Sequence, residues 1–474
     1  MTRRAAIVLL VALAGCGSAP HRPASAPVGD TVRATLVDRD DDGFLEPGPG
    51  EPLLDRGRPA RLGRVLATFG QLTDTHVRDE ESPARAPFLD RLGAPLNSTF
   101  RPQEAFSTQV LDSAVRALDA EHPQAVFVTG DIVDSAQSNE VTWAIDVLDG
   151  RLVHPDSGRP GYDGVQDADS PDPFYYRPDH DAPRHPGVLD AAQKPFRARG
   201  LDAPWYPTPG NHDLLVQGEV PPTPAIEAVA TGDRMVTTLD PALVQGDFSE
   251  RDASSAVAEA LSGGLPADSQ RVPADPDRRH VPPAEWMARM RAAAGPGVAI
   301  RGGRMDYAVD VGPSVRAVVL DTVRRAGGSR GLLSGAQVAW LRAQLAAAGE
   351  RWVVVFSHNP LDATGGGAPA LAALDADPHV VAAVAGNRHR NTIARHGHVW
   401  LVGTSSLADF PEQARMFRLR ETAGGVALET WMVDHDGRGL AGVSRELAYL
   451  DAQGGRPLGF AGTPADRNAR LYVP

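Results

Sequence analysis

Residues 205–213 read Trp-Tyr-Pro-Thr-Pro-Gly-Asn-His-Asp, a short apolar run that ends in Gly210, Asn211, His212 and Asp213. Short apolar runs rich in aromatic or β-branched side chains are typical of buried strands. Polar residues just beyond such a strand lie at the edge of an α/β sheet where ligands bind. This stretch therefore predicts a buried strand that delivers metal-binding or catalytic side chains to a site.

The same pattern recurs elsewhere in the chain. Residues 65–69 lead to Asp74 and His76, residues 125–128 lead to Asp131 and Asp134, and residues 352–356 lead to His358. Apolar residues at helical spacing predict helices over 103–120, 136–148 and 334–348, with Ser135 and Ser334 as N-caps of the last two. Strands that alternate with helices indicate an α/β fold.

Taken in order, the motifs resemble those of a known family. They are Asp74-x-His76, Gly130-Asp131-x-x-Asp134, Gly210-Asn211-His212-Asp213, His358 and Gly386-x-x-His389. This order resembles the calcineurin-like metallophosphoesterase superfamily, over roughly residues 64–435. The resemblance implies an α/β sandwich of two mixed β-sheets flanked by helices, whereas strand alternation alone would also permit a single sheet.

The resemblance also implies a role for each motif residue. Asp74, His76 and His389 would bind one metal ion, Asn211 and His358 would bind another, Asp131 would bridge the two, and Asp134 would hold a ligand in place. His212 would act at the leaving-group oxygen, and Asp213 would orient it. The ligand types suit two divalent ions of Mn, Fe or Zn. The implied reaction is hydrolysis of a phosphomonoester or phosphodiester by a metal-activated water.

One position departs from the family pattern. The last motif, usually Gly-His-x-His, has Asn387 in place of a histidine that binds the second metal. An amide oxygen binds Zn or Fe less tightly than imidazole does, so we expect a weaker second site or one that selects Mn or Mg. The substitution favours an alternative function, a catalytically weak surface lipoprotein that uses the scaffold for binding. Arg388 and Arg390 are candidates to bind substrate phosphate, and a solvated surface position is the alternative for both.

The first sixteen residues have the features of an export signal. Arg3 and Arg4 precede an apolar run over residues 5–14 that is too short to span a bilayer. Leu-Ala-Gly-Cys, ending at Cys16, resembles the lipobox of bacterial lipoproteins, whose cysteine is lipidated. Cys16 is the single cysteine of the chain. We expect an exported protein, held on the outer side of the cell membrane by lipid on Cys16; an ordinary cleaved signal is the alternative.

Composition divides the chain into segments. They are a signal at 1–16, a tether at 17–30, an acidic segment at 31–62, a metallophosphoesterase domain at 63–440 with insertions at about 150–203 and 214–300, and a C-terminal tail at 441–474. Long insertions are usually functional or disordered, so specificity is expected to reside there. In the acidic segment, Asp38, Asp40 and Asp42 have the spacing that opens a calcium loop, but Pro49 stands where the closing Glu belongs. A solvated turn fits them equally.

The charge of the chain restricts its partners. There are 47 Lys and Arg residues against 60 Asp and Glu residues, for a net charge of −13. Such a balance argues against a nucleic-acid-binding surface, and hence against a nuclease. It permits an anionic substrate, because bound divalent ions invert the local field. We expect a small phosphate ester as substrate, and the sequence does not indicate the oligomeric state.

Overall fold

The computed structural model describes residues 29–94, 96–235, 250–262, 269–454 and 458–474. The signal, Cys16 and nearly all of the tether lie outside this part of the chain, so export and lipid anchoring stay predictions. Among the described helices, none has both the length and the apolar character needed to cross a bilayer.

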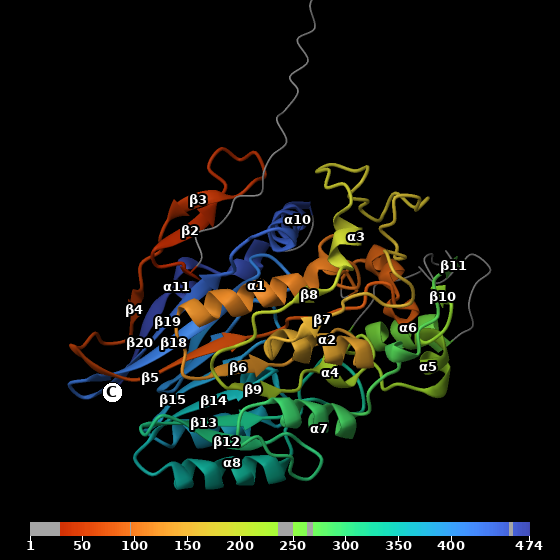
Figure 1. The fold of residues 1–474 in the computed structure, drawn as a ribbon. Coiled ribbons are helices and arrows are strands. Elements are labelled where there is room, and N and C mark those ends of the chain that lie inside the picture. The colour runs from red at the N-terminus through yellow and green to blue at the C-terminus, as the bar shows by residue number, and fades with distance from the viewer. Residues whose placement is uncertain (1–28, 95, 236–249, 263–268, 455–457) are drawn as a thin grey trace, which may run out of the picture.

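Two mixed β-sheets form the centre of the molecule (Figure 1). The larger has the order β4 (Leu54–Arg56), β20 (Ala469–Val473), β19 (Gly425–Asp434), β18 (Gln413–Thr422), β5 (Leu62–Leu72), β6 (Val126–Thr129), β9 (Trp205–Thr208), with β1 (Gly29–Asp30) beside β19. The smaller has the order β12 (Tyr307–Val311), β13 (Val315–Leu320), β14 (Trp352–Ser357), β15 (Val380–Ala385), β17 (Val399–Gly403), β16 (Thr392–His396). The predicted fold class, α/β with two mixed sheets flanked by helices, is confirmed.

Helices cover the outer faces of both sheets. α1 (Ser107–Ala120) packs on β18 and β19 and contacts α2 (Ser138–Leu148) and α10 (Leu440–Gly454). α8 (Gly335–Ala348) and α9 (Gly367–Asp375) cover the smaller sheet through a separate apolar cluster. With both faces covered, the central strands are buried on both sides, which explains their continuous apolar runs.

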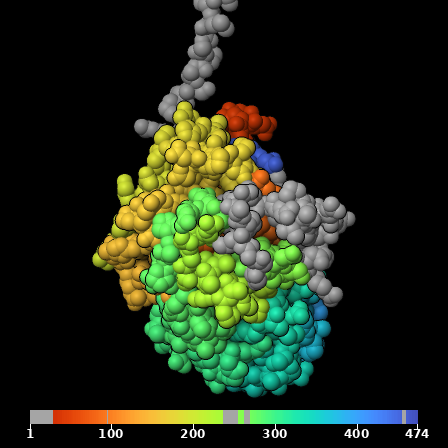
Figure 2. Space-filling view, turned by 90° about the vertical axis from the view of Figure 1, so that its right-hand side faces the viewer, coloured from red at the N-terminus to blue at the C-terminus, as the bar shows by residue number. Residues whose placement is uncertain are grey.

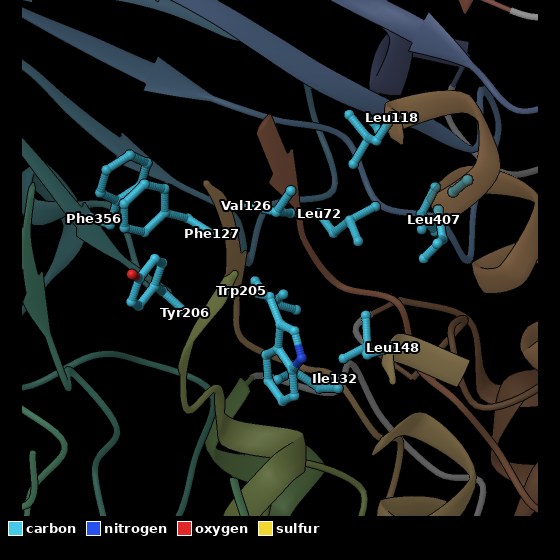
Figure 3. Packing of buried hydrophobic residues seen from close by; sticks show 14 of the residues in the cluster. Leu72, Leu118, Val126, Phe127, Ile132, Leu148, Trp205, Tyr206, Phe356 and Leu407 are labelled. Carbon is cyan, nitrogen blue, oxygen red and sulfur yellow. The ribbon is translucent and has the colours of Figure 1, made fainter. Parts of the chain in front are cut away.

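Aromatic side chains join the two sheets in the core. Phe127 of β6 stacks on Phe356 of β14, with 3.9 Å between ring centroids, and Tyr206 of β9 stacks on Phe127 (Figure 3). Phe69 of β5 meets Phe356 edge to face at 5.8 Å. Each such pair contributes about 0.5–1.5 kcal/mol beyond the area it buries. This packing holds the C-terminal ends of β5, β6, β9 and β14 in a fixed relation.

One of the two predicted helix caps is wrong. α8 begins after Ser334, whose hydroxyl accepts a hydrogen bond from the Gln337 N–H, as expected. α2 does not begin after Ser135, because Ala136 has a left-handed backbone with φ of 54°. The helix starts at Ser138 instead, after a capping box that Glu140 completes.

The segments outside the predicted domain belong to the same sheet. β20, from the expected C-terminal tail, pairs antiparallel with β19 and parallel with β4. β1 pairs with β19, and β2 (Ala34–Val37) pairs with β3 (Glu46–Pro49) in a separate hairpin. β1, β4 and β20 therefore belong to the same sheet as strands of the domain expected at 63–440.

The two insertions carry their own small elements. The first contains β7 (Leu152–Val153), α3 (Val188–Ala192) and β8 (Phe196–Arg197); the second contains α5 (Pro224–Ala230), β10 (Arg234–Met235), α6 (Glu250–Ser262), β11 (Gln270–Arg271) and α7 (Pro283–Ala293). Figure 2 shows them on one face of the molecule, the first (yellow) above the second (green).

Candidate metal centre

The predicted site residues follow the C-terminal ends of parallel strands. β5, β6 and β9 run parallel in the larger sheet, and β14 and β15 run parallel in the smaller sheet. The metal-binding candidates are Asp74 and His76 after β5, Asp131 after β6, Asn211 after β9, His358 after β14, and Asn387 and His389 after β15. Because the sheets share one core, these loops meet at one edge of the sandwich.

Four of these residues form one group of ligand atoms. One atom each from Asp74, His76, Asp131 and His389 lies within 4.8 Å of the others. His389 Nε2 lies 3.3 Å from Asp74 Oδ1 and 3.2 Å from His76 Nε2. His76 Nε2 lies 3.9 Å from Asp131 Oδ2. Ligand atoms at about 2.1 Å from one ion lie roughly 3.0–3.4 Å apart, so the group has nearly the spacing of a single metal site.

A second group lies on the other side of Asp131. His358 Nε2 lies 3.2 Å from Asp131 Oδ2 and 3.1 Å from Asn211 Oδ1. The Asn211 amide donates to the carbonyl of Gly218 at 3.2 Å, which turns its oxygen toward His358. Both groups therefore face the same oxygen, Oδ2 of Asp131. This is the position of a carboxylate that bridges two ions.

Each histidine in the two groups has its Nδ1 atom held by an oxygen acceptor. The partners are Asp134 Oδ1 for His76 at 2.9 Å, the Thr129 carbonyl for His358 at 2.9 Å, and an Asp409 carboxylate oxygen for His389. A proton donated at Nδ1 leaves the lone pair on Nε2, the atom that faces the carboxylates. Such partners fix the ring and the tautomer of histidines that bind metals, so the donors fit divalent Mn, Fe or Zn.

The loops that carry these residues have a strained backbone. Positive φ values between 42° and 65° occur at Asp74, His76, Asp131, Asn387 and His389. Left-handed backbone is costly for residues other than glycine and clusters at functional sites. A Cβ on Gly210 would lie 2.2 Å from Asp131 Oδ1, so the close approach of these loops requires glycine there.

The carboxylates make the site favourable for cations. Burial by itself would lower the pKa of His358, but the Asp131 carboxylate outweighs it and raises that pKa to about 10. Burial would also lower the pKa of His389, but the Asp74 carboxylate opposes this effect, and the pKa of His389 rises to about 9. At His76 burial prevails and lowers the pKa to about 4, which keeps this ring neutral. A field that stabilises imidazolium also stabilises a divalent ion.

Asp134 connects the metal groups to the predicted catalytic histidine. Its carboxylate accepts hydrogen bonds from His76 and from Arg78 Nη2, the latter at 2.5 Å. Burial opposes ionisation, but the Arg78 guanidinium holds the pKa of Asp134 well below its usual value. The main-chain carbonyl of Asp134 accepts from His212 Nδ1 at 2.6 Å. The expected supporting role of Asp134 therefore extends to two histidines.

The expected role of Asp213 is wrong. Its Oδ1 accepts hydrogen bonds from the main-chain N–H groups of Ile132 and Val133, each at 3.0 Å, and its Oδ2 accepts from Gly210 N–H at 2.8 Å. Asp213 closes the N-terminus of the short helix α4 (Asn211–Leu214) and fastens it to the loop after β6. The carbonyl of Asp134, rather than Asp213, orients His212.

Asn387 supports the site through its backbone. Its N–H donates to both carboxylate oxygens of Asp74, at 3.0 and 3.1 Å. Its side chain lines the cavity in front of the metal groups. Coordination of an ion by the Asn387 amide oxygen stays a prediction.

A cavity of about 350 Å³ opens in front of the two groups. His212 lines it with a ring that is 22% exposed, and its Nε2 is the ring nitrogen left for a substrate. Arg388 also lines it, whereas Arg390 lines a neighbouring cavity of about 190 Å³ together with Arg388. Gln217, Glu219 and Val257, all from the second insertion, complete one wall of the larger cavity.

The predicted calcium residues also lie together. Asp38, Asp40 and Asp42 stand between β2 and β3, with carboxylate oxygens within 4.8 Å of one another. Asp38 accepts hydrogen bonds from the Asp42 and Gly43 N–H groups, which is what a solvated turn would also show. Calcium binding there stays a prediction.

Asp409 and Arg101 belong to the site, although the motifs do not contain them. The Asp409 carboxylate forms a hydrogen bond with His389 Nδ1. It also accepts hydrogen bonds from Arg101 Nε at 2.6 Å and Arg101 Nη2 at 3.0 Å. All three line the cavity, and the carboxylate and guanidinium are nearly fully buried. Asp409 follows β17 in a polar stretch, and nothing in that stretch identifies its partners.

Replacing Asp409 by Asn should weaken metal binding by about 10- to 100-fold, because the ring of His389 loses its charged acceptor. Competition with a chromogenic chelator measures this affinity without reference to turnover. Asp375 makes a similar pair with His398 at 3.1 Å on the surface, so Asp375→Asn is the matched control. Equal metal affinity in the two variants would contradict a positioning role for Asp409.

No family model matches the sequence, and no curated protein matches it either. Among solved structures, the chain is similar to a dimetal phosphatase from Danio rerio, with a TM-score of 0.40 and 14% identity, over 78% of this chain and 97% of that one. It is similar to a purple acid phosphatase from yellow lupin seeds, with a TM-score of 0.32 and 11% identity, over 84% of this chain and 55% of that one. It is also similar to a proposed 5′-nucleotidase of Staphylococcus aureus, with a TM-score of 0.30 and 13% identity, over 77% of this chain and 53% of that one.

Proposed function

We propose that this chain is a calcineurin-like metallophosphoesterase that hydrolyses a phosphomonoester or phosphodiester outside the cytoplasm. The observation that carries the proposal is the single oxygen, Asp131 Oδ2, which faces His76 at 3.9 Å on one side and His358 at 3.2 Å on the other. A structural ion pair would not need imidazole nitrogens from two separate groups around one carboxylate.

In the proposed reaction the two groups of ligands bind metal ions, and His212 transfers a proton. Two divalent ions held by these residues would clamp the phosphoryl oxygens and lower the pKa of a water molecule. His212 in its cationic form can donate Nδ1–H to the carbonyl of Asp134 and Nε2–H to the leaving oxygen. After that transfer the neutral ring keeps the hydrogen bond at Nδ1, so its orientation does not change during the reaction.

Replacing His212 by Ala should lower turnover by on the order of a hundredfold or more, the scale for losing a general acid. The test is hydrolysis of 4-nitrophenyl phosphate and bis(4-nitrophenyl) phosphate by the metal-reconstituted protein, with metal content measured alongside. His379→Ala is the control, because His379 stands just before β15, at the end remote from His389. Equal rates in the His212 variant and the unmodified protein would overturn the assigned role.

The second candidate function is a surface lipoprotein that binds a ligand through this scaffold with little turnover. Asn387, in place of the histidine usual in the family, is the observation that favours it. His212 stands against it, because its Nε2 has no hydrogen-bond partner among the described residues, whereas its Nδ1 does. Asp213 favours neither function, because its carboxylate accepts hydrogen bonds from main-chain N–H groups alone. The His212→Ala comparison separates the two functions.

The proposed location is the outer side of the cell membrane. It rests on the charge, length and apolar character of residues 1–16 and on Cys16 as the single cysteine.

A further inference from the structure

A second and larger cavity adjoins the one in front of the metal groups. It has a volume of about 820 Å³, against about 350 Å³ for the first. Glu219 and Ser329 line both cavities, so the two are direct neighbours. Ligand pockets for small molecules are typically of roughly 300–1,000 Å³, so the second cavity is large enough for the body of a small-molecule ligand.

The second cavity lies on the leaving-group side of the site. Gly218 has a left-handed backbone with φ of 69°, and a Cβ there would lie 2.5 Å from His212 Nε2. The backbone at Gly218 therefore borders the nitrogen that meets the leaving oxygen. Glu219 follows directly and is the residue shared with the second cavity. A leaving group bound at His212 would continue from the first cavity into the second.

Another wall of the second cavity is basic. It consists of the loop 324–330, which carries Arg324 and Arg330, both exposed. The guanidinium of the neighbouring Arg325 is paired with Asp321 at 2.5 Å. The guanidinium of Arg324 has no hydrogen-bond or ion-pair partner among the described residues. Gly328 N–H donates to the carbonyl of Glu219 at 2.8 Å, so this wall is fastened to the wall that contains Glu219.

We propose that the leaving group of the natural substrate is extended and carries a second anionic group, a carboxylate or a phosphate, that binds at Arg324 and Arg330. The proposal rests on the phosphoesterase function proposed above and names its substrate class. A protein with a net charge of −13 repels anions at long range, and screening limits that field to roughly 8 Å at physiological salt. Two arginines in the cavity then decide which anions bind.

The test uses pairs of alkyl phosphates with four, six or eight carbons that end either in a methyl group or in a carboxylate. The unmodified protein should hydrolyse the carboxylate-ended ester of at least one length with a kcat/KM on the order of tenfold higher, because charge-assisted hydrogen bonds are the stronger kind. The double variant Arg324→Glu, Arg330→Glu should lose that preference through KM, with less than about a twofold change for the methyl-ended ester.

The matched control is Arg291→Glu, Arg342→Glu, which makes the same charge change at two exposed arginines outside both cavities. It should behave as the unmodified protein. Equal rates within every pair, or an equal loss of preference in the control, would overturn the anionic leaving group. Failure of the unmodified protein to hydrolyse any of the esters would instead overturn the phosphoesterase function, so the two failures are distinguishable.

Discussion

Replacing Asp131 by Asn should lower kcat/KM by on the order of a thousandfold or more and reduce the metal content of the protein. Asp131 Oδ2 is the atom that both ligand groups share, so its loss affects two ions at once. Metal ions contribute several kcal/mol to the stabilisation of charge in the transition state, and about 1.4 kcal/mol corresponds to a tenfold change in rate. Elemental analysis and hydrolysis of 4-nitrophenyl phosphate measure the two effects.

Asp306→Asn is the control for this variant. Asp306 is also buried, and it accepts hydrogen bonds from Asp321 N–H at 2.9 Å and from Gln337 Nε2 at 3.0 Å. An amide oxygen can accept both, and burial already raises the pKa of Asp306 to about 6, so loss of its charge should change little. Two ions per chain and full activity in Asp131→Asn would contradict the bridging position.

Replacing Asp134 by Ala should destabilise the protein by about 3 kcal/mol, at the lower end of the range for breaking a buried ion pair. Asp134 is fully buried, and its removal takes an acceptor from both His76 and Arg78. Arg78 keeps Glu104 at 2.8 Å, which is why the upper end of the range is not expected. Urea denaturation of the metal-free variant measures the change without a contribution from bound ions.

A surface pair serves as the comparison for Asp134. Arg64 and Glu421 are in contact at 2.7 Å with largely exposed side chains, so Glu421→Gln should leave the urea midpoint unchanged. If Asp134→Ala also left it unchanged, the buried network would not be the support of the site that its contacts indicate.

The features that were predicted correctly are local in sequence. Each strand is an apolar run, and the polar residues that follow it belong to the same few positions, as in the run from Trp205 to His212. Once β5, β6 and β9 of the larger sheet pack against β14 and β15 of the smaller sheet, the C-terminal ends of these strands bring the residues together. The clustering of the candidate side chains and the fold class therefore follow from short motifs in a fixed order.

The features that were missed depend on partners far away in the sequence. Asp409 meets Arg101 across 308 positions, and no pattern around either residue names the other. Asp213 is next to His212 in the chain, but its contacts are with the backbone after β6, because the first turn of α4 points it there. Ser135 has the residue type of an N-cap, and the left-handed backbone at Ala136 prevents its use. Tertiary structure decided all three.

The position of β20 has a consequence for how the molecule is made. β4 lies at the edge of the larger sheet and pairs with β20, a partner more than 400 residues later in the chain. During synthesis β4 must wait until residues 469–473 have left the ribosome, and pairings of such long range are slow to form. The larger sheet therefore cannot be completed at its β4 edge until residues 469–473 have been synthesised.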